Sequence, residues 1–125
     1  MSPEKVKALE DKYSFFRPFR GVECGDGWYG IIDELCEVLS LVNFKGTKVE
    51  YIKEKFGGLR VGLSHIGGDN YGIMISAIDR AHEKSLETCE ECGKIGKLRS
   101  IIGWWLKTLC YDCEIKMKKQ LNGQN

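Results

Sequence analysis

The chain contains two C-x2-C pairs, Cys89-Glu90-Glu91-Cys92 and Cys110-Tyr111-Asp112-Cys113, with 17 residues between them. This spacing is typical of a zinc ribbon, in which each pair binds the same ion through two thiolates. Four thiolates leave no open position for water, so we expect one structural Zn²⁺ per chain. Gly93 directly follows the first pair, where a turn of this kind often needs a positive φ. Two unrelated pairs of reduced thiols are the alternative interpretation.

The segment between the two pairs combines aromatic and basic residues. Trp104 and Trp105 lie within the apolar run 101–106, and Arg99 is one of the basic residues around it. Such a mixture could stack on nucleic-acid bases or contact a partner protein. We expect one of the two tryptophans to pack against the rest of the protein, which leaves the other as a candidate for recognition at the surface.

Positive and negative charges nearly cancel. The 125 residues include 19 Lys and Arg against 18 Asp and Glu, which gives a formal charge of +1. This balance excludes the strong basic excess with which a protein coats nucleic acid irrespective of sequence. No segment approaches the roughly 18 uninterrupted apolar residues of a membrane span, and residues 1–5 lack the apolar run of a secretory signal. We therefore expect a cytoplasmic protein without a membrane partner.

Apolar residues spaced by three and four predict amphipathic helices. The pattern covers residues 3–13, 26–42 and 71–88, and a short basic helix is expected over residues 114–121. Asp26 is the expected cap of the second helix. Cys36 lies on the apolar stripe of that helix, where a free thiol packs as a small hydrophobe. The role of Cys24, in a glycine-rich turn, stays open.

Two segments read as strands, Thr47–Phe56 and Leu59–Ser64, with Gly57-Gly58 as the expected two-residue turn. One face of this hairpin is the expected core side and holds Ile52, Phe56, Leu59, Val61 and Leu63, interrupted by Glu54. The other face presents Tyr51, Lys53, Lys55 and Arg60. The sequence therefore predicts an α+β fold. Residues 1–88 form amphipathic helices and a small antiparallel sheet, residues 89–125 form a zinc ribbon and a short helix, and the two pack as one unit.

The predicted turn places Lys55 directly opposite Arg60. Two like charges in a cross-strand pair destabilise the sheet by up to about 1 kcal/mol unless an acid or a bound anion lies between them. A solvated face with Glu50 or Glu54 as counter-ion is one interpretation. An anion site is the other, because the planar fork of Arg60 suits a phosphate or carboxylate and Gly62 leaves room for a flat group.

Other candidates for ligand contact lie outside the hairpin. Trp28 and Tyr29 mark a helix start, where unpaired amides favour anions. The candidate set for ligand binding comprises Lys53, Lys55, Arg60, Tyr51, Trp28, Tyr29, Arg99, Trp104 and Trp105, and the candidate metal ligands are Cys89, Cys92, Cys110 and Cys113. His65 and His82 belong to no metalloprotease, nucleophile-elbow or phosphate-loop motif, so we expect binding rather than catalysis and name no catalytic residue.

Three blocks of the sequence together resemble a family of small, mostly uncharacterised proteins from bacterial and bacteriophage genomes. The blocks are residues 23–32 with Leu35-Cys36, residues 53–60 (KEKFGGLR), and residues 89–93 with Gly96, Leu98-Arg99, Gly103-Trp104 and residues 108–110. The resemblance spans residues 23–113. It implies a phage origin and, by analogy, a protein that binds and neutralises a host component in the host cytoplasm.

The leading hypothesis is a non-enzymatic zinc-ribbon protein that binds a nucleotide-like anionic ligand or nucleic acid. Sequestration of a host nucleotide signal, as a counter-defence, is the role that the resemblance adds. The first alternative is an interaction module or inhibitor that docks on a host protein through the loop with Trp104 and Trp105. The second is a phosphate-handling enzyme whose acid or base the motifs do not reveal. A homo-oligomer is compatible with each of these hypotheses.

Overall fold

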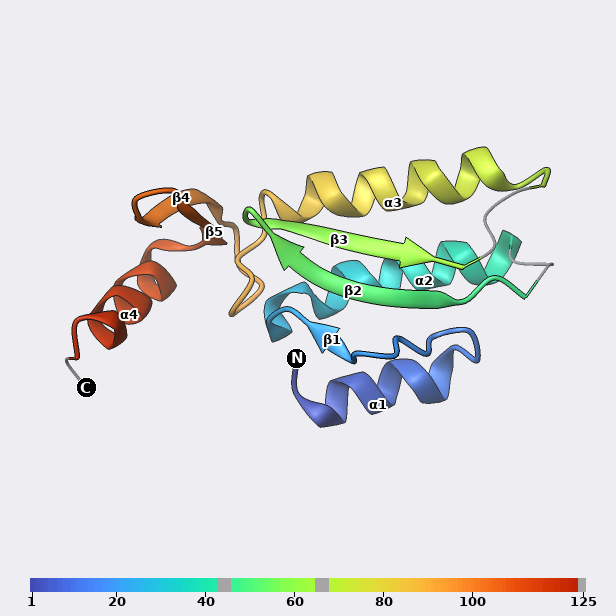
Figure 1. Cartoon of the computed structure of the whole chain (residues 1–125), viewed down its shortest axis with the longest axis horizontal. Coiled ribbons are helices and arrows are strands. Elements are labelled where there is room, and N and C mark those ends of the chain that lie inside the picture. Colours follow the sequence, from blue (N-terminus) through green and yellow to red (C-terminus); the bar gives the residue numbers. More distant parts are fainter. Residues whose placement is uncertain (43–45, 65–67, 124–125) are drawn as a thin grey trace.

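The computed structural model of the chain describes residues 1–42, 46–64 and 68–123. In chain order the elements are α1 (Pro3–Lys12), β1 (Val22–Glu23), the 3-10 turn η1 (Asp26–Trp28), α2 (Tyr29–Val42), β2 (Val49–Lys55), β3 (Gly58–Leu63), α3 (Tyr71–Ser85), β4 (Lys97–Ile102), β5 (Trp105–Leu109) and α4 (Tyr111–Leu121) (Figure 1). The predicted α+β class, with small antiparallel sheets and a C-terminal cysteine cluster compatible with a zinc ribbon, is confirmed.

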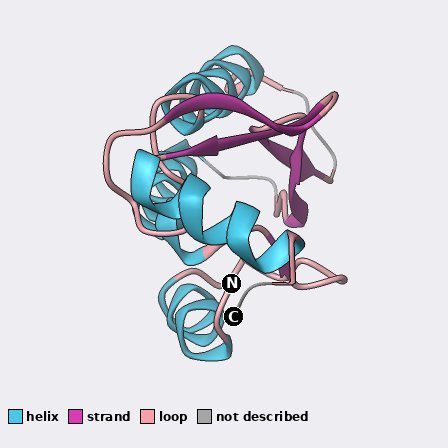
Figure 2. Cartoon of the chain, turned by 90° about the vertical axis from the view of Figure 1, so that its left-hand side faces the viewer, coloured by secondary structure: helices cyan, strands magenta, loops and turns pink. Residues whose placement is uncertain are grey.

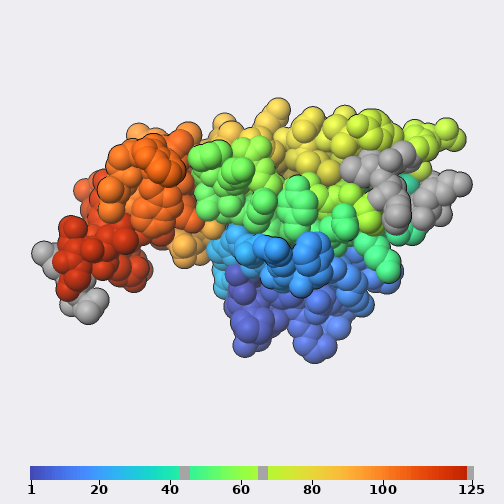
Figure 3. Space-filling view, in the orientation of Figure 1, coloured from blue at the N-terminus to red at the C-terminus, as the bar shows by residue number. Residues whose placement is uncertain are grey.

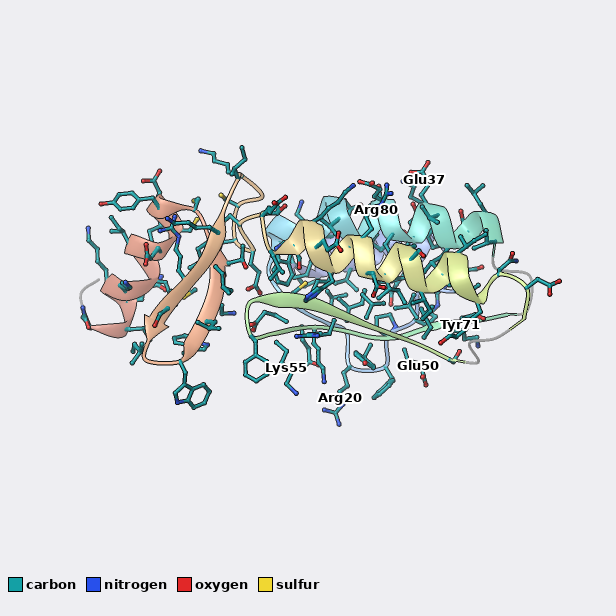
Figure 4. The ribbon with its side chains drawn as sticks, turned by 90° about the horizontal axis from the view of Figure 1, so that it is seen from above. Arg20, Glu37, Glu50, Lys55, Tyr71 and Arg80 are labelled. Atoms are coloured by element: carbon teal, nitrogen blue, oxygen red, sulfur yellow. The ribbon has the colours of Figure 1, made fainter. Side chains whose placement is uncertain are left out.

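Strands β1, β2 and β3 form one sheet in that order, with β1 parallel to β2 and β2 antiparallel to β3. Figure 4 shows α2 and α3 on one side of this sheet, whereas Arg20, Glu50 and Lys55 point to the other side. We call this second side the open face. The two-residue strand β1 was missed in the sequence, because its pairing with β2 is a tertiary contact within a glycine-rich connection.

The core lies between the sheet and the helices. The three-and-four spacing of α2 buries one whole side of that helix, namely Ile31, Ile32, Leu35, Cys36 and Leu39. Leu9 of α1, Phe16 and Trp28 are fully buried in the same cluster, where they meet Ile52 of β2 and Leu59 of β3. The core position expected for Cys36 therefore agrees with its burial, and the periodicity of the sequence is sufficient to explain which side of each helix is covered.

The β2–β3 turn differs by one residue from the expected turn. Lys55 pairs with Gly58, so the two turn residues are Phe56 and Gly57, with φ of +54° and +82°. Positive φ at both positions is the mark of a type I′ turn. Gly58 is needed in the strand instead, because a Cβ there would overlap the imidazole of His82 on α3. Close packing against α3 thus selects the turn.

This shift changes the cross-strand partners but not the faces. Lys53, rather than Lys55, lies opposite Arg60. Ile52, Leu59 and Leu63 were expected on the core side of the hairpin, and all three are buried. Phe56 was expected on that side but is 55% exposed, because it occupies the turn and not the strand.

Asp26, the expected cap of the second helix, and Asn70, the N-cap residue of α3, form hydrogen bonds with distant segments instead of capping a helix. Asp26 lies inside η1, and its Oδ1 accepts a hydrogen bond from the backbone N–H of Ser2 at 2.7 Å. The side chain of Asn70, at the start of α3, donates to the carbonyl of Val42 at 2.7 Å. Both side chains therefore connect separate segments, which local spacing along the chain does not reveal.

The C-terminal segment lies at one end of the molecule (Figures 1 and 3). Strands β4 and β5 form a hairpin, and α4 follows β5 directly. Figure 2 views the molecule from this end, with α4 and the hairpin in front of the other elements. Its own core is small, because the buried apolar residues there are only Cys89, Ile101 and Leu109 among the described residues, with Met117 of α4 packed against them.

Candidate metal centre and open face

Four sulfur atoms meet between the C-terminal hairpin and α4. Cys89 and Cys92 come from the loop after α3, Cys110 is the N-cap of α4, and Cys113 lies in its first turn. Their Sγ atoms all lie within 4.8 Å of one another, and those of Cys92 and Cys110 are 3.7 Å apart. Tetrahedral zinc with Zn–S bonds near ~2.3 Å requires about 3.8 Å between sulfurs. The cluster is therefore able to bind a metal ion.

Backbone geometry holds the first cysteine pair in a tight turn. The N–H of Gly93 donates to the carbonyl of Cys89 at 2.9 Å, and the N–H of Cys89 donates to the carbonyl of Lys94 at 2.7 Å. Gly93 has a φ of +84°, as predicted for this position. At the second pair, the backbone N–H of Cys113 points at the sulfur of Cys110 and lowers the pKa of that thiol to about 7. A thiolate, the form that binds metal, is thereby favoured.

Glu90, between the two ligands of the first pair, connects the ribbon to residues 25–27. Its carboxylate accepts the N–H of Gly25 at 3.0 Å, and its carbonyl accepts the N–H of Gly27 at 2.7 Å. The side chain is 3% exposed, and burial raises its pKa despite the neighbouring Lys107. The turn that holds two metal ligands is therefore also the turn that docks on the N-terminal part.

Lys107 of β5 forms a second link between the two parts. Its Nζ lies 3.2 Å from a carboxylate oxygen of Glu54 on β2 and 3.2 Å from one of Glu90. Burial disfavours the charged amine, but the two carboxylates outweigh this effect and raise the pKa of Lys107. Glu54 is thus occupied by Lys107 and does not act as the counter-ion expected for the basic hairpin face.

Close backbone approach completes this joint. A Cβ on Gly27 would overlap the carbonyl of Cys89, and a Cβ on Gly57 would overlap the side chain of Leu98. The hydroxyl of Thr108 donates to the carbonyl of Gly57 at 2.7 Å. The three blocks that were quoted from the sequence, around residues 25–28, 54–58 and 89–93, therefore meet at one place, the contact between the sheet unit and the ribbon.

Two of the candidate ligand residues are used inside the structure. Trp28 is fully buried, and its indole N–H donates to the carbonyl of Thr88 at 2.8 Å. Arg99 donates through Nε to the carbonyl of Leu109 and through Nη1 to Glu114, both at 2.8 Å. The single polar group of Trp28 is used in this bond, and two of the five N–H donors of Arg99 hold its guanidinium against β5 and α4, so we attribute to both a role in stabilising the ribbon and its contact with the sheet unit.

The remaining basic candidates gather on the open face. Lys53 and Arg60 are direct cross-strand partners, and neither has an acidic side chain at ion-pair distance within the described residues. The Nζ of Lys53 lies 5.0 Å from the ring centre of Tyr51, and that of Lys55 lies 5.5 Å from the ring centre of Phe56. Two basic side chains of β2 therefore each lie beside an aromatic ring, one on β2 and one in the following turn.

The space beside Arg60 is filled by the protein itself. A Cβ on Gly62 would overlap the ring of Tyr51, which lies opposite it on β2. The room that we expected for a flat ligand group is thus taken by Tyr51. Two acids share this surface: Glu23 pairs in register with Lys53, and Glu50 is exposed on β2.

The other aromatic candidates differ in exposure. Trp104, in the β4–β5 turn, is 83% exposed, whereas Trp105 is 39% exposed. Trp105 is the more covered of the two, but both keep part of their rings at the surface. Tyr29 is half-buried, and its ring centre lies 5.0 Å from the Nζ of Lys5.

Cys24 and Cys36 do not belong to the metal cluster. Both are buried, and burial raises the pKa of each thiol to about 12. At neutral pH these two thiols are therefore protonated and inert. Cys24, whose role the sequence left open, therefore packs in the core of the sheet unit.

No family model, no curated protein and no solved structure matches this chain. None of the helices that the structure describes combines the length and the apolar character needed to cross a membrane.

Proposed function

We propose that this protein is a zinc-stabilised binding module whose open face takes the phosphate of a nucleotide-like ligand or a nucleic acid. The observation that carries the proposal is the pairing of Lys53 with Arg60 across β2 and β3. Two cations in one cross-strand pair repel each other, and a phosphate between them would convert this repulsion into attraction. The fork of Arg60 can donate two parallel hydrogen bonds to such a group.

The charges around this pair favour an anion without making the whole surface basic. Arg20 and Lys55 add two cations to the open face, whereas Glu23 and Glu50 contribute two acids. The formal charge of the chain is only +1. Binding should therefore be local, at the cross-strand pair, and not a general attraction of the protein to polyanions.

In this proposal the metal has a structural role. Four cysteine ligands fill the shell of a zinc ion, so no position is left for a substrate. The ion would hold the ribbon together, and the ribbon in turn contacts the β2–β3 turn through Thr108 and Lys107. Zinc would thus stabilise the hairpin that presents the cations, at a distance from the bound phosphate.

A module of this kind acts by holding its ligand. If the ligand is a free nucleotide, tight binding lowers the concentration available to other proteins, which is the sequestration role implied by the resemblance to phage proteins. If the ligand is a nucleic acid, the same cations would contact the backbone phosphates. Both cases use the Lys53–Arg60 pair, so one set of variants tests them together.

The experiment measures binding of ATP by calorimetry and of a fluorescein-labelled oligothymidylate by anisotropy, both at about 50 mM salt. Arg60→Ala removes a charge-assisted hydrogen bond and should weaken binding about tenfold or more. The matched control is Arg80→Ala, because Figure 4 shows Arg80 on the helical side of the molecule. Circular dichroism and zinc content verify that both variants are folded. Failure of the wild type to bind either probe, or equal losses in the two variants, would overturn the proposal.

A further inference from the structure

The open face of the sheet continues onto the ribbon. Thr108 of β5 donates to the carbonyl of Gly57, and Leu98 of β4 packs over the same turn. Figure 3 views the molecule from the side of the open face and shows the strands of the sheet, in green, directly beside the orange hairpin. In Figure 4 the closed end of the β4–β5 hairpin projects to the same side as Lys55. The two surfaces thus form one face.

Aromatic and basic side chains are spread over the whole length of this face. Lys53 and Lys55 are two residues apart on one side of β2, a distance of about 6.6 Å along the strand. Phe56, at the β2–β3 turn, is 55% exposed, and Trp104, at the β4–β5 turn, is 83% exposed. Cations along a strand followed by two exposed rings match a chain of phosphates and bases better than one small molecule.

We infer that this continuous face binds single-stranded nucleic acid, laid from the sheet across the β2–β3 turn onto the ribbon, where Trp104 stacks on a base. The inference rests on the proposed function and specifies its ligand. Proteins that bind single strands combine a cationic track with aromatic rings on which successive bases stack. A duplex fits poorly, because its bases are already stacked on each other and offer no free face to Trp104 or Phe56.

The pairing of rings with cations distinguishes this ligand from a protein partner. Lys53 lies over the ring of Tyr51 on β2, and Lys55 lies over the ring of Phe56 in the following turn, so each of these two rings is paired with a cation. Such a pair is complementary to a nucleotide, because the ring can stack on the base and the cation can contact the phosphate. Leu98 and Ile102 of β4, 46% and 62% exposed, are aliphatic side chains that a protein partner would use, and the experiment includes that outcome.

The test measures the affinities of labelled oligothymidylates of increasing length, and follows tryptophan fluorescence with the same unlabelled strands. Trp28 is buried, so quenching reports on Trp104 and Trp105. We expect affinity to rise with length until the strand reaches the ribbon, and quenching to begin at that length. Log affinity should fall with log salt with a slope of about −2 to −3, as for three to four phosphate contacts on a single strand.

Trp104→Ala separates the two proposals. It should lower the affinity for the longest strand about tenfold and leave the affinity for the shortest strand unchanged. The reason is that a stacking contact is lost only where the strand reaches Trp104. Tyr71→Ala is the control, since Tyr71 is 49% exposed at the far end of α3 from the ribbon (Figure 4). Zinc content confirms that the ribbon of Trp104→Ala is intact.

The outcomes distinguish failure of the proposed function from failure of the single-strand inference. If neither ATP nor any strand binds the wild-type protein, both proposals are wrong. If ATP binds as tightly as the longest strand and Trp104→Ala has no effect on strand binding, the single-strand inference alone is overturned. A duplex that binds as tightly as the single strand overturns it as well. Loss of a protein partner in Trp104→Ala, with strand binding unchanged, would assign the tip to protein docking instead.

Discussion

The sheet unit and the ribbon are stabilised by different means. Among the described residues, seventeen apolar side chains are buried in the core of the sheet unit, whereas three are buried in the ribbon. Burial of apolar surface can stabilise the first region, but the second is too small for that, as is usual for segments below about 40 residues. The four-cysteine cluster lies where the apolar core is missing. The difference indicates that one region is stabilised by packing and the other by a metal.

Removal of the metal should have the largest effect, and we expect the loss of structure to be greatest in the ribbon. Structural zinc contributes about 10 kcal/mol or more to the folding of small zinc domains. We expect a chelator to abolish amide protection across residues 97–121 and to leave it largely intact across residues 29–39, as measured by hydrogen exchange with mass spectrometry. Alkylation provides the second readout, because the four clustered thiols should become reactive while Cys24 and Cys36 stay protected. Loss of protection in both regions together would show that they fold as one cooperative unit.

The joint between the two regions should be the next most sensitive place. In Gly27→Ala the new methyl group would overlap the carbonyl of Cys89, and neither backbone can move easily. We expect a loss of about 2–3 kcal/mol in the free energy of unfolding, typical of overpacking. Gly30→Ala is the matched control, because nothing lies within 4 Å of a Cβ at this helical position. That variant should gain up to about 0.5 kcal/mol from helix propensity, less than at an interior position, because Gly30 lies in the first turn of α2.

Urea unfolding of the two variants measures both values. Equal stabilities of Gly27→Ala and Gly30→Ala would mean that the ribbon does not press on residues 25–27 in solution. A lowered zinc affinity in Gly27→Ala, with the N-terminal core intact, would show in addition that docking on Gly27 helps to shape the first cysteine pair. Metal binding in the ribbon would then depend on the contact between the two regions as well as on the four cysteines.

Patterns local in sequence predicted most of the fold. The helices follow from apolar spacing, and the cysteine cluster follows from two C-x2-C pairs, because these signals operate within a few residues. Gly27 and Gly57 were visible in the sequence, but the reason for a glycine at each position, close approach to the ribbon, appears only in three dimensions. Glycines that no local turn explains were therefore the sequence feature from which the contact between the sheet unit and the ribbon could have been predicted.

Features that depend on distant contacts were not predictable in the same way. The turn moved to Phe56-Gly57 because Gly58 packs against His82, which lies 24 positions further along the chain. Glu90 and Lys107 form the link between the two regions, but each appears in the sequence as one more charged residue near the cysteines. Tertiary packing therefore determines the register of the hairpin and the ion pairs, whereas local periodicity determines where helices and strands form.

Alkaline pH should destabilise the sheet unit through its buried thiols. Below about pH 8.5 the Cys36 thiol is protonated in both folded and unfolded chains, so its contribution is constant. Above that pH the unfolded chain releases the proton, while the folded chain keeps it until about pH 12. Stability therefore falls with rising pH, by up to about 1.4 kcal/mol per pH unit for this one group.

Cys36→Ala isolates this contribution. Urea midpoints measured at intervals between pH 8 and 10.5 should decline less steeply in the variant than in the wild type, although the variant starts from a lower stability because of the lost sulfur. Other groups that titrate in this range, such as Tyr13, are present in both proteins and cancel in the comparison. Parallel declines would contradict the burial of this thiol.

The smallest expected effect is on the affinity for the oligothymidylate, and it comes from the acidic side chain that β1 places on the open face. Glu23 of β1 stands in register with Lys53 and reduces the positive potential beside Arg60. In Glu23→Gln we expect the affinity for the labelled oligothymidylate to rise about two- to threefold at low salt and the difference to vanish at high salt, as for other exposed charge interactions. Glu37→Gln changes the net charge equally but lies on the helical side (Figure 4), so it should have little effect. Equal gains in both variants would show that net charge, and not the open face, determines binding.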